Sequence, residues 1–136
     1  DSTRFVSPGR SFRLDSLCQM SPNFSLPSSA ILKGDHVWVK TTLWIYPEDM
    51  EAVNSVWVIN TLHHDHKCYN YEASQKECSR MIPGQWNFIT VYYLITNTRS
   101  PDDTFMIYLW SSQGKKVWLD DMKVFAYTPK EIMSDN

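Results

Sequence analysis

The sequence has few glycines, little net charge and no long apolar run. Four glycines in 136 residues leave no glycine-rich loop of the kind that cradles phosphate groups. Thirteen basic and fifteen acidic residues give a formal charge of -2, which lacks the positive footprint of a nucleic-acid-binding domain. No apolar run approaches the roughly 20 residues that a membrane-spanning helix needs. We therefore expect neither a phosphate-loop protein, nor a nucleic-acid partner, nor a membrane span in this chain.

The three cysteines do not form a recognisable metal-binding or redox motif. No two of them are spaced as CxxC, which disfavours a structural zinc site and a thioredoxin-type centre. Cys68 and Cys78 are close enough in sequence for a disulfide that closes a short loop, worth roughly 3 kcal/mol. The sequence leaves two alternatives open: this disulfide, or three free and partly buried thiols that include Cys18.

Apolar and polar residues alternate with a period of two, which is typical of β-strands. Turn-forming residues such as Pro83-Gly84 separate the alternating segments, and the single helical candidate, residues 48–53, is too short to determine the fold. The predicted strands are residues 11–17, 37–46, 55–63, 85–95, 104–110 and 116–127. We predict an all-β protein, an antiparallel sandwich or barrel, with residues 1–136 as a single domain.

The predicted strands have an aliphatic face and a face that mixes aromatic with polar side chains. The aliphatic face suits the core of a sandwich. Aromatic rings beside polar groups suit a sugar, whose C–H faces are apolar and whose hydroxyl groups need hydrogen-bond partners. The same rings could instead only cover the sandwich, since Trp and Tyr are favoured in strands. The candidate glycan-binding residues are Trp57, Tyr92, Tyr108 and Trp110, with Lys40 and His63 as polar partners.

The C-terminal third of the chain carries a pattern that resembles a known family. Trp86 opens a strand, residues 102–105 form an Asp-Asp-Thr-Phe turn, and the final strand reads VWLDDMKVFAY. The sequence Trp-Leu-Asp-Asp-Met at 118–122 resembles the closing strand of jelly-roll carbohydrate-binding modules and galactose-binding-like domains. Residues 8–14 and 37–47 are compatible with earlier strands of that family.

The resemblance implies a jelly-roll β-sandwich of about eight strands in two sheets. It also implies a non-catalytic carbohydrate-binding module of a secreted or bacterial surface protein, located in the periplasm, at the cell surface or outside the cell. Many members hold a structural calcium ion, which here would use Asp120 or Asp121 together with Asp1 or Asp15. Calcium takes about six to eight oxygens. Neighbouring strand residues point to opposite faces, so at most one aspartate of the pair can face inward.

The run His63-His64-Asp65-His66 leaves three roles open. It could be a polar loop without a ligand, or it could contact a glycan. It could also bind a transition metal, because alternate residues of an extended chain share a face and Cys68 lies in the same register as His64 and His66.

Catalysis is not expected. A glycosidase needs two carboxyl groups that face each other across a cleft, whereas nearly all candidates here fall in predicted loops, and no GxSxG motif is present. These candidates are Glu48, Asp49, Glu51, Glu72, Glu77, Asp102 and Asp103. The chain starts at Asp1 without a signal-peptide core, so we expect a piece of a larger protein whose other domains are its neighbours. The alternative to glycan binding is therefore an architectural or protein-interaction domain of a larger bacterial surface protein.

Overall fold

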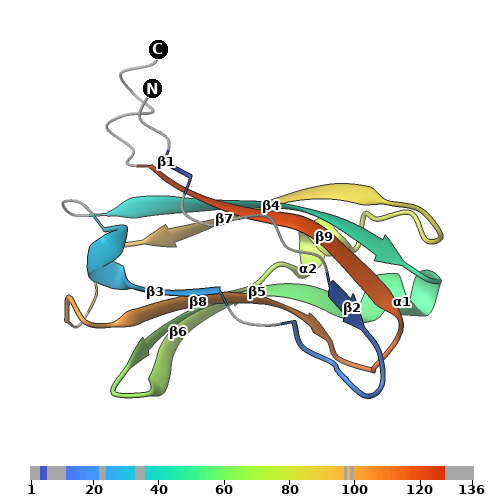
Figure 1. The fold of residues 1–136 in the computed structure, drawn as a ribbon, viewed down its shortest axis with the longest axis horizontal. Coiled ribbons are helices and arrows are strands. Elements are labelled where there is room, and N and C mark those ends of the chain that lie inside the picture. Colours follow the sequence, from blue (N-terminus) through green and yellow to red (C-terminus); the bar gives the residue numbers. More distant parts are fainter. Residues whose placement is uncertain are drawn as a thin grey trace, which may run out of the picture.

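In the described part of the chain, nine strands form two antiparallel sheets that pack face to face (Figure 1). The computed structural model describes residues 4–5, 12–21, 24–32, 36–96, 98 and 100–127. The strands are β1 (Arg4–Phe5), β2 (Phe12–Leu14), β3 (Phe24–Pro27), β4 (Val37–Pro47), β5 (Val56–His64), β6 (Lys67–Ala73), β7 (Asn87–Ile95), β8 (Thr104–Ser111) and β9 (Val117–Tyr127). The helices are η1 (Ser28–Ala30), α1 (Met50–Ser55) and α2 (Gln75–Cys78). None of the described helices is long and apolar enough to cross a membrane.

The strand order is that of a jelly roll. The five-stranded sheet has the order β1-β9-β4-β7, with β2 also paired to β9, and the four-stranded sheet has the order β3-β8-β5-β6. The pairs β2·β9, β3·β8, β4·β7 and β5·β6 are nested in sequence, with β5·β6 innermost. A long antiparallel hairpin rolled onto itself gives this nesting. The predicted all-β jelly-roll sandwich of two sheets is therefore confirmed.

The core lies between the two sheets and is filled by alternate residues of the strands. Every second residue of β4 and of β8 is buried, as the alternation predicts, and most of the positions between them stay at least partly exposed. Burial of one such aliphatic or aromatic side chain contributes about 1.5–3 kcal/mol. The buried apolar members are Val37, Val39, Leu43 and Ile45 in β4, and Phe105, Ile107 and Leu109 in β8.

The first predicted strand, residues 11–17, is longer than the one observed. Strand β2 ends at Leu14 because the Asp15 carboxyl group accepts hydrogen bonds from the N–H groups of Leu17 at 2.9 Å and Cys18 at 3.1 Å. Such a local side-chain contact turns the chain away from the sheet. Leu17 is consequently 96% exposed, and Ser11 lies outside the described residues.

Strands β1, β3 and β6, which are short or polar, were not predicted. Strands β3 and β6 lie at the two edges of the four-stranded sheet, where one contains Pro27 and the other reads KCYNYEA. The helical candidate at residues 48–53 becomes α1, which begins two residues later. The Asp49 carboxyl group caps this helix by accepting a hydrogen bond from the N–H of Ala52 at 2.9 Å.

Strand β9 contains a β-bulge at the Asp-Asp pair. The register between β4 and β9 shifts between Thr42 and Trp44, and Asp121 has a φ of 53°. The bulge inserts one residue and reverses the alternation beyond it. Asp120 is exposed, Asp121 is partly exposed and Met122 returns to the core. Both aspartates therefore lie at the surface, and neither faces inward.

Candidate functional site

The outer surface of the four-stranded sheet carries a strip of side chains along β8 and β5. Residues at alternate positions point outward and face each other across the two strands. The facing pairs are Trp110 with Trp57, Tyr108 with Ile59, Met106 with Thr61, and Thr104 with His63. The strip thus has an aromatic end and a polar end.

Two adjoining cavities lie over this strip, and together we call them the β5–β8 groove. Their volumes are 390 Å³ and 370 Å³, and both are lined by His63 and Met106. From Trp110 to Thr104 the strip measures roughly 20 Å, at about 3.4 Å per residue. Met20, Cys68 and Tyr71 complete the wall of the cavity at the aromatic end. Asp65, His66 and Asp102 complete the wall of the cavity at the polar end.

Aromatic rings dominate one end of the groove. Trp57 and Trp110 pack edge to face with their ring centroids 6.0 Å apart. Tyr108 follows along β8, and Tyr71 of strand β6 is 69% exposed. Burial raises the pKa of Tyr108, so its hydroxyl group stays protonated at neutral pH and can donate a hydrogen bond. This end therefore offers ring faces together with a hydroxyl group.

Hydrogen-bonding atoms line the middle of the groove. His63 Nε2 lies 2.9 Å from Thr61 Oγ1, and the Thr61 hydroxyl group donates to the Met106 carbonyl oxygen at 3.5 Å. The His63 tautomer that fits both contacts of Thr61 carries its hydrogen on Nε2 and leaves Nδ1 as an acceptor. A ligand hydroxyl group could donate to this nitrogen.

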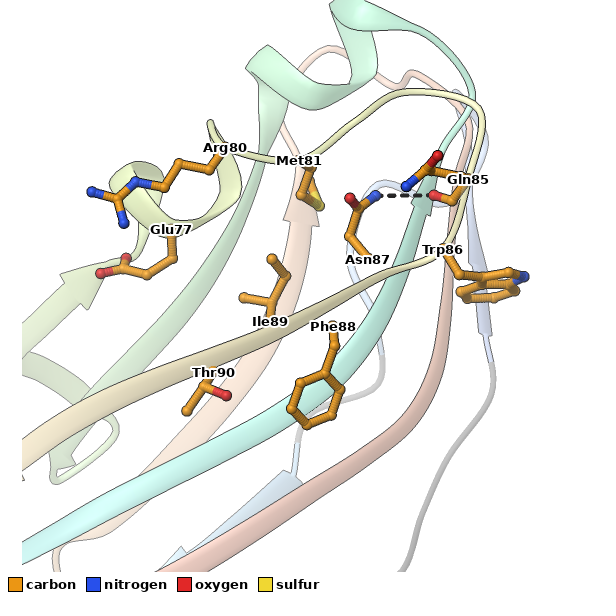
Figure 2. Close-up of a pocket in the computed structure, with 9 residues that line it drawn as sticks. All are labelled: Glu77, Arg80, Met81, Gln85, Trp86, Asn87, Phe88, Ile89 and Thr90. Carbon is orange, nitrogen blue, oxygen red and sulfur yellow. Dashed lines mark hydrogen bonds between the residues drawn. The ribbon is translucent and has the colours of Figure 1, made fainter.

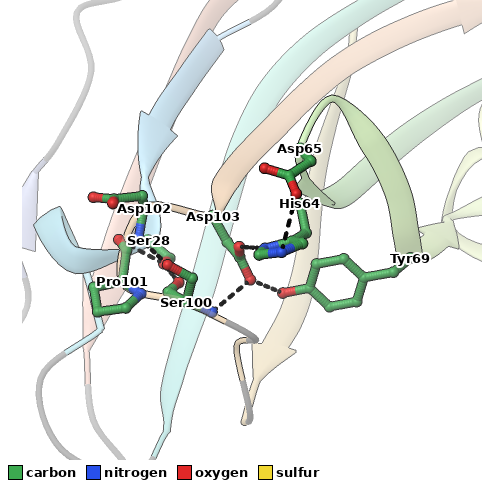
Figure 3. Close-up of polar contacts among 8 residues, drawn as sticks. All are labelled: Ser28, His64, Asp65, Tyr69, Ser100, Pro101, Asp102 and Asp103. Atoms are coloured by element: carbon green, nitrogen blue, oxygen red, sulfur yellow. Dashed lines mark hydrogen bonds and ion pairs between the residues drawn. The ribbon is translucent and has the colours of Figure 1, made fainter.

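A buried carboxyl group fixes the polar end of the groove (Figure 3). Asp103 Oδ1 accepts a hydrogen bond from His64 Nδ1 at 2.6 Å. Its Oδ2 accepts from the Tyr69 hydroxyl group at 2.7 Å and from the backbone N–H of Ser100 at 3.1 Å. These contacts join the β5–β6 hairpin to the loop between β7 and β8, and so they hold together the two segments that form this end.

The histidine run does not adopt the extended arrangement on which the metal alternative depends. Asp65 and His66 have φ values of 49° and 64° and form the turn between β5 and β6. His63 lines the groove while His64 bonds to Asp103, so His64 and His66 do not share a strand face. Within the described ranges, no group of three or more His, Cys, Asp or Glu side chains is placed to hold a metal ion.

The predicted glycan-binding residues divide between the two outer faces of the sandwich. Four of them lie at the β5–β8 groove: Trp57, His63, Tyr108 and Trp110. The other two, Lys40 and Tyr92, face each other on the outer surface of the five-stranded sheet. There, Lys40 Nζ lies 6.0 Å from the centre of the Phe125 ring. The prediction therefore combined two separate surfaces, and only the first group is brought together around one groove.

Thr61 and Tyr71 also line the groove and were not predicted from the sequence. Tyr71 was not predicted because strand β6, which contributes this side of the groove, was not predicted. Tyr71 lies opposite Thr61 of β5. The sequence carried no clear signal for this strand, because burial does not alternate along residues 67–73 and the register with β5 shifts between Leu62 and His63.

The predicted calcium residues lie on the other sheet. Asp120 and Asp121 lie on the surface of β9, where Asp121 Oδ2 is 3.4 Å from Lys123 Nζ. Asp15, one of the two acidic residues expected to complete the site, forms an ion pair with Arg13 at 3.0 Å. The other expected residue, Asp1, lies outside the described residues. A calcium ion on this strand stays a prediction.

The three cysteines are free thiols, so the disulfide alternative is wrong. Cys18 and Cys68 are exposed, whereas Cys78 is buried against the core. Burial raises the pKa of the Cys78 thiol to about 12. Its thiolate, the reactive form, is therefore scarce at neutral pH.

A separate cavity of 470 Å³ lies beside β7 (Figure 2). Glu77 and Arg80 lie on one side of the strand in this view, and the rings of Trp86 and Phe88 lie away from them. The Asn87 amide group donates hydrogen bonds to the carbonyl oxygens of Ile82 and Gln85, so it stabilises its own loop. Rings and polar groups do not converge here as they do in the β5–β8 groove.

Neither the models of known protein families nor the curated proteins match this sequence. Among solved structures, the arabinose-bound α-L-arabinofuranosidase MgGH51 has a TM-score of 0.48 and 11% identity, over 95% of this chain and 24% of that chain. A cyclase from Fischerella sp. TAU has a TM-score of 0.44 and 13% identity, over 79% of this chain and 57% of that chain. The CBM22-2 xylan-binding domain of Paenibacillus barcinonensis Xyn10C has a TM-score of 0.43 and 14% identity, over 90% of both chains. The chain thus spans a quarter of the first protein, little more than half of the second and most of the third.

Proposed function

We propose that the protein binds a glycan in the β5–β8 groove and does not act on it catalytically. The observation that carries the proposal is the composition of the strip, in which Trp57, Trp110 and Tyr108 adjoin Thr61 and His63. Rings can stack on the C–H faces of sugars while polar atoms bond their hydroxyl groups. A strip of roughly 20 Å suits a chain of sugar units better than one free monosaccharide.

The charges at the polar end favour a neutral glycan. Asp65 and Asp102 line that end and would repel the carboxylate or sulfate groups of an acidic sugar. We therefore infer that uncharged polysaccharides or oligosaccharides are the ligand class, with the stacked units at the Trp110 end.

The test is binding to a broad glycan array, followed by calorimetry with the best soluble ligand. Trp110→Ala removes the ring at the end of the strip. Loss of this stacking ring should cost about 2 kcal/mol, which is roughly 30-fold in Kd. Trp44→Ala is the matched control, because it removes a ring that is 40% exposed on the opposite sheet, and it should leave Kd unchanged.

Two outcomes would contradict the proposal. Equal affinity of Trp110→Ala and the unmodified protein would exclude the groove as the binding site. If the folded protein bound no glycan on the array, glycan binding would be refuted and the architectural or interaction domain would be favoured instead. A parallel array with a chelator tests the predicted calcium at Asp120 and Asp121, since loss of binding would indicate a supporting metal.

A second candidate function, protein interaction, is favoured by the outer face of the five-stranded sheet. Trp44, Phe88, Tyr92 and Leu94 are 40%, 54%, 47% and 38% exposed there. Exposed apolar side chains gathered on one surface are typical of interaction sites. The last three belong to β7, the strand at the edge of that sheet.

A further inference from the structure

Among the described strands, three of the four sheet edges are protected against pairing with another strand. Edge strands expose unpaired N–H and C=O groups, and proteins protect them with charges, proline or short lengths. Strand β3 contains Pro27, and β6 carries Lys67 and Glu72. At the third edge, β1 and β2 both pair with β9, and they have only two and three residues.

The fourth edge, strand β7, has none of these protections. It is nine residues long, reads NFITVYYLI, and contains neither a charged residue nor a proline. Its pairing with β4 runs without a register shift from Val37 opposite Ile95 to Ile45 opposite Asn87. No other described strand pairs with it. An edge of this length and regularity is suited to accept another strand.

A cavity lies between the first half of β7 and the segment that contains helix α2. The 470 Å³ cavity is lined by six consecutive residues, 85–90. Consecutive residues of a strand point to opposite faces, so a cavity that contacts all of them must lie beside the edge rather than over one face. Glu77, Arg80 and Met81 form its other wall (Figure 2). The cavity therefore marks a place where an extended chain can lie along the strand.

The side chains of β7 are suited to pairing with an identical strand. In a twofold antiparallel pair centred on the middle residue, Val91, Phe88 lies opposite Leu94 of the other copy and Thr90 lies opposite its Tyr92. Phe88, Tyr92 and Leu94 are exposed apolar residues on the outer face, and each would gain an apolar or β-branched neighbour. Strand β7 has no charged side chain, so the two paired strands do not repel each other.

We propose that β7 pairs antiparallel with β7 of a second copy of this chain. The pair is isologous, which is the arrangement that closes as a dimer instead of growing into a filament. It joins the two five-stranded sheets into one continuous sheet, and it pairs the one described edge strand that is long, uncharged and free of proline. The inference is independent of the glycan site, which lies on the other sheet.

The test is the mass of the protein in solution, measured by sedimentation across the micromolar range. The unmodified protein should be a dimer. The double variant Thr90→Lys and Tyr92→Lys places positive charges opposite each other across the pair and should be monomeric. Two controls should stay dimeric: Trp44→Lys charges the same face away from the edge, and Tyr71→Lys charges the edge strand of the other sheet. Circular dichroism verifies that every variant is folded.

A disulfide between copies tests the register directly. The double variant Thr90→Cys and Tyr92→Cys, in which serine also replaces the exposed Cys18 and Cys68, should form intermolecular disulfides on oxidation. Residue 90 of one copy faces residue 92 of the other, and facing residues of antiparallel strands lie within disulfide range. A monomeric unmodified protein would overturn the proposal. Dimers abolished by Trp44→Lys but kept by the β7 lysine variant would also overturn it, since they would form through the sheet face. Neither result would alter the glycan-binding test, because Trp110→Ala leaves β7 intact.

Discussion

Replacing Asp103 tests whether one buried carboxyl group holds the polar end of the groove together. Its side chain is 1% exposed and accepts hydrogen bonds from His64, Tyr69 and the backbone of Ser100. A typical hydrogen bond contributes roughly 1 kcal/mol net, and one to a charged group contributes more. Asp103→Ala removes three such bonds, so we expect the free energy of unfolding to fall by about 3 kcal/mol.

Urea titration followed by tryptophan fluorescence measures this loss, and calorimetry gives the matching shift in Tm. For a chain of 136 residues the entropy of unfolding is about 0.29 kcal/mol/K, so 3 kcal/mol corresponds to roughly 10 °C. Tyr69→Phe removes only one of the three hydrogen bonds and should cost about 1 kcal/mol. In the Asp103→Ala background the same change should cost almost nothing, because its acceptor is already absent.

A cost of Asp103→Ala below about 0.5 kcal/mol, the range of ordinary surface substitutions, would show that the Asp103 carboxyl group does not hold this end together. Simple addition of the costs of Asp103→Ala and Tyr69→Phe would show that the two groups do not interact. An unchanged m-value is required for either comparison, because it indicates that the same surface is exposed on unfolding.

Two further predictions concern thiols and turns. Ellman's reagent should modify Cys18 and Cys68 rapidly, because both thiols are exposed. Cys78 should react only after unfolding, because Cys78 is buried and its pKa is raised to about 12. Rapid reaction of all three thiols would contradict this prediction. Gly84→Ala and Gly114→Ala both place a side chain at positive φ, which costs about 1–2 kcal/mol. Only at Gly114 would the new Cβ meet backbone, at 2.9 Å, so Gly114→Ala should lower Tm further than Gly84→Ala, and equal losses would refute that clash.

The long strands could be predicted from the sequence because their alternation is strong. The predicted segments 37–46 and 104–110 differ from β4 and β8 by one residue at the C-terminal end. Alternation identifies which face of a strand is buried, but it does not identify the neighbouring strand. The nested strand order was therefore expected only from the family resemblance. The weakly alternating edge strands β3 and β6 were missed, since their sequences are shaped by edge protection as well as by the core.

The candidate site could be predicted only in part for the same reason. Tyr108 and Trp110 alternate in one strand, so their common face followed from the sequence. That Trp57 faces Trp110 depends on the β5·β8 pairing, which no local pattern specifies. Lys40 and Tyr92 fitted the same criterion equally well, yet they belong to the other sheet. Both outer faces mix rings with polar groups, and only the fold separates them.

That separation determines how the two proposed surfaces can operate together. Strand β7 belongs to the five-stranded sheet and the groove to the four-stranded sheet, so pairing through β7 leaves the groove open in each copy. A dimer then carries two grooves held at a fixed separation. A polymeric glycan repeats its binding unit along one chain, so a second groove meets its ligand at a high effective concentration once the first is occupied. If both proposals hold, avidity of this kind would strengthen attachment to a polysaccharide surface beyond the affinity of one groove.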